Sequence, residues 1–249
     1  MSKKEAYLYI SALLRAREPR MLSREKAERL LDAPSFTEAA KSLADSGYED
    51  MSHMNADEIE QALSRRRAAV FKELSGLLPE PAVLDVFRVK YDYHNAKVVL
   101  KAEAMGTDPA PLMSESGRLP AETLLNAYRE ERSVDLPGRL AEALKEGKEL
   151  LSRSGNPQLA DFLLDKAYFA ELQDLCGKLD SRFLSDYVAV LADSTNLRSA
   201  VRTLRMGKNA EFLREALVTG GTVGVERLQA AATGDSLSAL FGGAVLTDA

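Results

Sequence analysis

Residues 92–106 read DYHNAKVVLKAEAMG, and residues 193–207 read DSTNLRSAVRTLRMG. Both stretches follow the pattern Asp-x-x-Asn-x-basic-x-x-x-basic-x-x-x-Met-Gly, and they start 101 residues apart. Side chains three or four residues apart share a face of an α-helix, so the pattern predicts one polar helix that occurs twice. A repeat of this kind indicates a supersecondary unit used at least two times.

Eight matched polar residues carry the repeat, four from each copy: Asp92, Asn95, Lys97, Lys101, Asp193, Asn196, Arg198 and Arg202. Two interpretations remain open. The residues form a polar ladder that orients helices within each lobe, or they line a cavity that receives a partner. Repetition favours the structural interpretation, because active sites are seldom duplicated in every unit. Basic residues four apart repel each other, so each copy needs acidic or carbonyl partners.

Two further features extend the repeat. The glycine that ends each copy suits a left-handed helix C-cap. The stretches 117–119 (GRL) and 221–223 (GTV) are a weaker match at an offset of 104. Ser11, Arg17 and the Leu-x-x-Glu at 22–25 resemble a third, degraded copy near the start of the chain. These matches predict internal lobes at roughly 1–86, 87–182 and 183–249.

The rest of the chain is also typical of helices. Apolar residues recur at three- and four-residue spacing in residues 57–75, 120–131, 161–176 and 183–206. Ser23 and Ser35 are expected N-caps, and Glu38 completes a capping box with Ser35. Alternating strand patterns and Asn-Gly or Asp-Gly turns are not found, and the breaks between helices are short. The sequence therefore predicts an all-α fold.

The composition argues against several classes of protein. Among 249 residues, 45% are hydrophobic and 29% charged, as in globular proteins. A net charge of −5 argues against nucleic acid as a partner, and the basic run 65–67 is expected to be a solvated helix face. One cysteine and no signal-peptide pattern fit a reducing, cytosolic setting. No apolar run approaches the length of a transmembrane helix.

Residues that carry catalytic chemistry are scarce. The two histidines, His53 and His94, lie far apart, and the lone Cys176 sits on an apolar helix face where a core role is expected. The glycine-rich run 220–224 lacks the Gly-Lys-Ser/Thr ending of a phosphate-binding loop and is expected to be a turn. We therefore expect no catalytic, metal or cofactor site and no small-molecule substrate.

Several stretches resemble the C subunit of V-type and A-type (archaeal-type) rotary ATP synthases, a family that includes the d subunit of eukaryotic V-ATPases. Residues 91–102 (YDYHNAKVVLKA) are similar to its signature helix, and residues 164–169, 183–187 and 193–198 follow in the family's order. The N-terminal run 27–36 also fits. Two features depart from the family: residues 11–13 (SAL) replace its Asn-Ala-Arg, and relatives continue past this C-terminus, so the third lobe is expected to be incomplete.

The resemblance implies a funnel of three similar helical lobes around a pseudo-threefold axis. It implies a non-catalytic component of the central stalk on the cytoplasmic face of the membrane. There the protein joins the rotor shaft, formed by the D and F subunits, to the proteolipid ring and transmits torque for proton or sodium transport. Two alternatives remain: a helical-repeat scaffold that binds other proteins, and an unrecognised helical enzyme with a pocket around His53 or Cys176.

Overall fold

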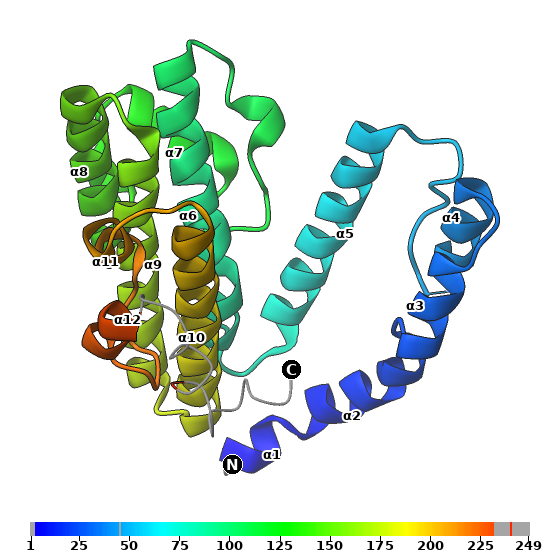
Figure 1. Ribbon diagram of the computed structural model, residues 1–249. Coiled ribbons are helices and arrows are strands. Elements are labelled where there is room, and N and C mark those ends of the chain that lie inside the picture. Colours follow the sequence, from blue (N-terminus) through cyan, green and yellow to red (C-terminus); the bar gives the residue numbers. More distant parts are fainter. Residues whose placement is uncertain (1–2, 45, 232–239, 241–249) are drawn as a thin grey trace. The chain divides into compact units, whose positions relative to one another are not determined.

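The computed structural model describes residues 3–44, 46–231 and 240 (Figure 1). Every regular element in these ranges is a helix, which confirms the predicted all-α fold. The chain divides into two compact units, Met1–Leu84 and Asp85–Ala249. The predicted division into three lobes stays a prediction. Across the described residues, no helix combines the length and apolar character that crossing a membrane requires.

The first unit contains a series of short helices followed by one long one. Its core is small: buried Ala40, Met51 and Ala62 pack together with partly buried neighbours such as Leu43 and Ile59. A salt bridge joins Arg17 to Glu73 at 2.5 Å. The elements are α1 (Lys3–Ala6), α2 (Leu8–Arg17), η1 (Glu18–Arg20), α3 (Arg24–Leu31), α4 (Phe36–Ala44) and α5 (Ala56–Leu77).

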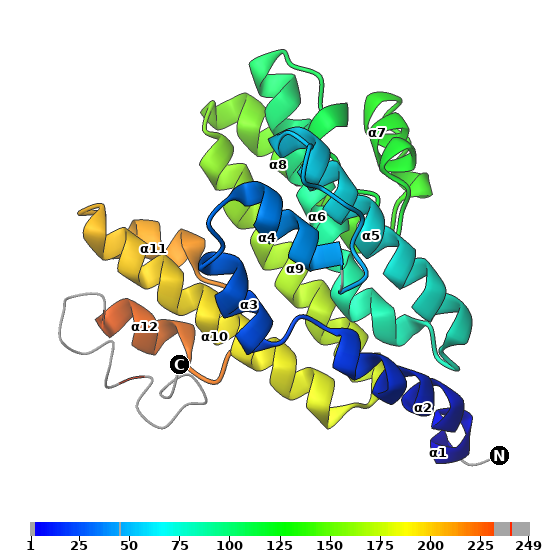
Figure 2. The same cartoon turned by 90° about the vertical axis from the view of Figure 1, so that its right-hand side faces the viewer.

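The second unit is built around long helices. Helix α9 packs against α8 on one side and α10 on the other, and α11 packs on both α9 and α10 (Figure 2). Helix α6 begins at the end of the first unit and lies almost wholly in the second. The elements are α6 (Ala82–Met105), η2 (Ala110–Leu112), α7 (Ala121–Arg129), η3 (Ser133–Asp135), α8 (Gly138–Ser154), α9 (Pro157–Leu179), α10 (Arg182–Arg205), α11 (Ala210–Ala216) and α12 (Val225–Ala231).

The helix boundaries follow capping chemistry that the sequence indicates. Ser23 accepts a hydrogen bond from the Lys26 backbone N–H, and Ser35 accepts one from Glu38, as N-caps do. A reciprocal capping box forms at a position that we did not predict, between Asn55 and Glu58. These bonds satisfy backbone donors that the first helical turn leaves free.

Both copies of the repeated helix end in the same way. Gly106 and Gly207 adopt positive φ angles of 64° and 62°, which confirms the predicted left-handed C-caps. After α6 the Thr107 amide donates to the Ala102 carbonyl at 2.9 Å, and after α10 the Lys208 amide donates to the Thr203 carbonyl at 3.0 Å. This is the Schellman arrangement, which turns the chain back toward its own helix.

Candidate functional site

The buried face of α10 holds the loop that connects α11 to α12. Asn196 is fully buried; its amide nitrogen donates to the Val218 carbonyl at 2.9 Å, and its amide oxygen accepts from the Val218 N–H at 2.9 Å. One turn earlier, the Asp193 carboxylate accepts from the backbone N–H of Thr222 at 3.0 Å and of Val223 at 3.2 Å. The Thr222 hydroxyl adds a bond of 2.5 Å.

The same centre exists on α6, with the same geometry. Asn95 exchanges two hydrogen bonds with the backbone of Ser114, at 2.9 Å and 2.8 Å. Asp92 accepts from the backbone N–H of Arg118 at 2.9 Å and of Leu119 at 3.3 Å. The loop residues bound by each Asp are those of the weaker sequence match, so the two matches describe one physical unit: a helix and the loop that it holds.

A glycine lets each loop approach its carboxylate. A Cβ atom added to Gly117 would lie 2.3 Å from the Asp92 carboxylate, and one added to Gly221 would lie 2.2 Å from Asp193. Real Cβ atoms essentially never come this close to another heavy atom. The matched glycines are therefore a steric requirement of the loop-binding centre.

The first centre contains a charged network that the second lacks. The Arg118 guanidinium forms ion pairs with Asp92 and Glu171, both at 2.6 Å, and the Tyr93 hydroxyl donates to Glu171 at 2.8 Å. Glu171 belongs to α9, so the network links two long helices to one loop. At the position of Arg118 the second copy has Thr222, which binds its carboxylate through a neutral hydroxyl.

Burial is the largest single influence on the pKa of Asp92, Arg118 and Tyr93, but it does not decide the direction for all three. Burial raises the pKa of the Asp92 carboxyl above its usual value, and Arg118 and two backbone amides oppose that shift only in part. Burial acts to lower the pKa of Arg118, but its hydrogen bonds to Asp92 and Glu171 outweigh this effect and raise it. Burial and the neighbouring Glu171 also raise the pKa of the Tyr93 hydroxyl, which keeps it protonated as a donor.

The basic residues of the two copies lie in different surroundings. On α6, Lys97 forms an ion pair with Asp165 and Lys101 one with Asp161, each at 2.6 Å, and both acids come from α9. On α10, Arg198 and Arg202 are exposed. The Arg198 guanidinium donates to the Ser194 carbonyl one turn earlier on the same helix at 3.2 Å.

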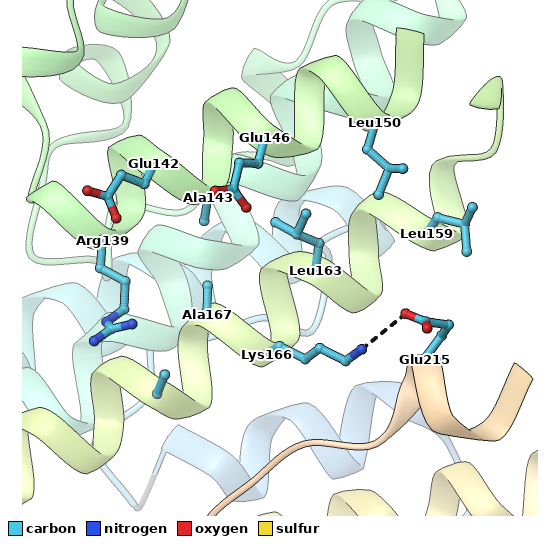
Figure 3. Close-up of a pocket in the computed structure, with 11 residues that line it drawn as sticks. Arg139, Glu142, Ala143, Glu146, Leu150, Leu159, Leu163, Lys166, Ala167 and Glu215 are labelled. Atoms are coloured by element: carbon cyan, nitrogen blue, oxygen red, sulfur yellow. Dashed lines mark hydrogen bonds and ion pairs between the residues drawn. The ribbon is translucent and has the colours of Figure 1, made fainter. Parts of the chain in front are cut away.

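A surface groove of about 700 Å³ runs between α8, α9 and α11 (Figure 3). Its floor is apolar and includes Leu150, Leu159 and Leu163. The ion pair between Lys166 and Glu215, 3.1 Å long, lies at its edge. None of the eight repeat-matched residues lines this groove. Among the residues that the structure describes, no group of three His, Cys, Asp or Glu side chains could hold a metal ion.

A comparison with protein families identifies the family of this chain. The family model described as "ATP synthase (C/AC39) subunit" matches residues 10–244, nearly the whole chain. The chain belongs to the ATP synthase (C/AC39) subunit family.

Individual members of this family are similar at low identity over most of the chain. The C subunit of the V-type sodium ATPase of Enterococcus hirae is 25% identical over 233 residues, which cover 93% of this chain and 71% of that protein. The C subunit of the A-type ATP synthase of Thermococcus onnurineus is 27% identical over 237 residues, which cover 89% of this chain and 63% of that protein. The C subunit of the V-type ATP synthase of Thermus thermophilus is 25% identical over 220 residues, which cover 84% of this chain and 67% of that protein. The chain thus spans about two thirds of the length of its relatives.

The polar centres of this family member were only half predictable from the sequence. The repeat identified the helix side chains but not what they bind: Asp and Asn hold backbone groups, which leave no mark in the sequence. The acids Asp161 and Asp165 were also missed. A signal for them exists, because they lie four residues apart, the same spacing as Lys97 and Lys101. Ser11 of the degraded third copy is exposed, unlike the buried asparagines of the other two copies.

Proposed function

We propose that this chain is a non-catalytic component of the central stalk of a V/A-type rotary ATPase. In this role it joins the rotor shaft, formed by the D and F subunits, to the proteolipid ring on the cytoplasmic face of the membrane, and it transmits torque during ATP-coupled ion transport. Membership of the ATP synthase (C/AC39) subunit family over residues 10–244 carries the proposal. Relatives named as the C subunits of V-type and A-type ATPases support it.

The repeated centres suit a part that transmits force. Each centre ties a loop to a long helix through five hydrogen bonds to buried Asp and Asn side chains. Four of the five involve the backbone of the loop, and one involves a loop side chain. Several hydrogen bonds from one loop to two side chains of the same helix restrain both the position and the orientation of the loop. We propose that Asp92, Asn95, Asp193 and Asn196 organise the lobes in this way and do no chemistry.

The basic residues belong to the same proposal. Lys97 and Lys101 bind α9 and so help to fix the orientation of α6 within its lobe. Charged pairs of this kind contribute more to orientation and specificity than to net stability. A body with oriented helices and short loops resists deformation, which is what torque transfer between shaft and ring requires.

Affinity purification from native membranes tests the function. The chain carries a C-terminal tag and is expressed at its normal level. We expect the D and F shaft subunits and the proteolipid to be recovered with it in constant ratio, and we expect the purified chain alone to hydrolyse no ATP. As a control, a tag on the catalytic head should retrieve D, F and the proteolipid from the same membranes. The proposal is refuted if that control succeeds and the tagged chain is recovered without all three.

A second measurement separates this role from that of a general scaffold. Purified chain is added to complexes from which the endogenous protein has been depleted, and ATP hydrolysis coupled to ion transport is followed. A coupling protein restores transport and hydrolysis together. A scaffold that binds the complex without joining shaft to ring leaves hydrolysis uncoupled, and that result contradicts the proposal even if the chain co-purifies.

A further inference from the structure

The groove between α8, α9 and α11 has one wall that carries two acids without a partner. Glu142 and Glu146 lie one turn apart on α8, both are exposed, and both line the groove (Figure 3). Within residues 3–44 and 46–231, neither carboxylate forms an ion pair or a hydrogen bond. Like charges at this spacing repel each other, so a cation placed beside the pair is favourable.

The cations of the groove are already matched by acids. Lys166 of α9 pairs with Glu215 of α11 at 3.1 Å. Arg139 of α8 pairs with Asp174 of α9 at 2.5 Å. The two α8 glutamates are therefore a surplus of negative charge along this groove, and a ligand that complements it is cationic.

The floor of the groove is apolar. Half-buried Leu150, Leu159 and Leu163 lie toward one end, and the small side chains of Ala143 and Ala167 lie nearer the middle (Figure 3). Small side chains leave room for another backbone to approach, and the leucines offer an apolar surface beyond them. A ligand that fits has one apolar face with positive charge along its edge, which is the character of an amphipathic helix.

The walls also favour a helix over an extended peptide. The lining residues span 139–150 on α8 and 159–170 on α9. At 1.5 Å per residue, each wall is about 16 Å long, or three helical turns. Both walls are helices, whose backbone groups bond within their own helix, so they offer no edge to which a strand could pair. A helix satisfies its own backbone and needs only side-chain contacts.

Helix α11 shows how a short helix binds α9 in this molecule. The Phe212 ring meets the Phe162 ring edge-on at 5.5 Å, and Leu213 is fully buried. The ion pair between Glu215 and Lys166 lies at the edge of that contact. An apolar anchor flanked by one charged pair is therefore a mode of docking that the surface of α9 already supports.

We propose that the groove between α8 and α9 binds an amphipathic α-helix of a partner polypeptide, whose apolar stripe lies on the floor and whose two cations, four residues apart, face Glu142 and Glu146. Side chains at i and i+4 of a helix lie about 5–6 Å apart at Cβ, so the spacing of the cations matches that of the glutamates. The proposal rests on the groove and its charges and does not depend on the role in torque transfer.

Three designed peptides test the charge that the groove selects. Each is a fluorescent helix of about 14 residues, or four turns, with Ala and Leu on one face. They differ at two flanking positions four residues apart, which are both Lys, both Gln or both Glu. Binding to the full-length chain is measured by anisotropy. We expect the Lys peptide to bind at least about tenfold more tightly than the Gln peptide, and the Glu peptide to bind most weakly.

Three protein variants assign the binding to the groove. Glu142→Lys with Glu146→Lys should reverse the order, so that the Glu peptide binds most tightly. The control Asp57→Lys with Glu60→Lys makes the same change of net charge at two exposed positions of α5 and should keep the original order. Ala167→Phe fills the floor without changing any charge and should weaken the binding of all three peptides.

A peptide of residues 232–249 and the oligomeric state test the other occupants. The charged side chains of that segment are two acids, at positions 235 and 248. If it binds as tightly as the Lys peptide, a segment of this chain occupies the groove and the proposal is wrong. If sedimentation shows that the unmodified chain is a dimer and the Glu142/Glu146 variant a monomer, a second copy occupies it, which also overturns the proposal.

The peptide series can overturn the proposal as well. Equal binding of the Lys, Gln and Glu peptides means that the two glutamates select nothing. The proposal is also wrong if the Glu142/Glu146 variant keeps the original order at unchanged melting temperature and helical content. Equal loss of the preference in the Asp57/Glu60 control assigns the binding to net charge rather than to the groove.

Discussion

A single methyl group at Gly221 is expected to detach the loop that α10 holds. The Cβ of Gly221→Ala would lie 2.2 Å from the Asp193 carboxylate, whereas ordinary contacts begin near 3.4 Å. The residue is not at a positive φ, so alanine meets no backbone strain, and the clash alone decides the outcome. Either the loop or the carboxylate must move by about 1 Å, which takes hydrogen bonds outside their normal range of lengths.

The cost follows from the bonds that such a movement breaks. Asp193 accepts from the N–H groups of Thr222 and Val223 and from the Thr222 hydroxyl. A hydrogen bond to a charged group contributes about 1.5–3 kcal/mol to stability. Losing one or two of the three predicts a destabilisation of about 3 kcal/mol. For a unit of this size that lowers the melting temperature by about 6–12 °C.

Thermal and urea unfolding, followed by circular dichroism, measure the effect. Gly76→Ala is the matched control: Gly76 lies inside α5 with open space around its Cβ position, so alanine should stabilise the helix by about 0.5–1 kcal/mol. Combining Gly221→Ala with Asp193→Ala tests the cause. Because the clash needs the carboxylate, the glycine substitution should cost little once Asp193 is already alanine.

The reasoning is refuted if Gly221→Ala is as stable as the unmodified chain. It is also refuted if the two substitutions are additive, because additive costs mean that the added methyl group and the carboxylate do not meet.

Three further predictions concern buried polar groups. Asn196→Ala leaves the Val218 N–H and carbonyl unpaired, so we expect a loss of about 2–4 kcal/mol and faster hydrogen exchange of the Val218 amide. Arg118→Met removes the cation that offsets the burial of Asp92. Burial raises the folded pKa of the Asp92 carboxyl, and such a carboxyl stabilises the protein at low pH and loses that contribution as pH rises through the folded pKa. In urea titrations this variant should therefore be more destabilised at pH 7 than at pH 4. Burial raises the pKa of the Cys176 thiol, so native chain should react with a disulfide reagent at pH 8 at least about a hundredfold more slowly than urea-unfolded chain.

Helix positions and ends were the most predictable part of this fold. The predicted segment 183–206 corresponds to α10, Arg182–Arg205, because an apolar stripe marks it; its N-cap, Ser181, was not predicted. The C-caps at Gly106 and Gly207 followed from the chemistry of glycine alone. The capping box at Asn55 and Glu58 could have been predicted by the same rule.

Long-range partners were not predictable in the same way. Glu171 reaches Arg118 and Tyr93 because α9 returns alongside α6, and no local pattern encodes that return. The loops bound by Asp92 and Asp193 contribute backbone groups, which every residue except proline offers equally. The weaker repeat at 117–119 and 221–223 does mark the two loops in the sequence, because each loop needs a glycine, Gly117 or Gly221, next to the carboxylate.

The comparison of the two copies separates what the fold needs from what each copy contacts. Asp and Asn are kept in both because they bind backbone, and that function is independent of the loop's side chains. The side chain that makes the third contact to the carboxylate differs: it is Arg118 in the first copy and Thr222 in the second. Arg118 also reaches Glu171 on α9, and the described part of the second copy has no helix that corresponds to α9.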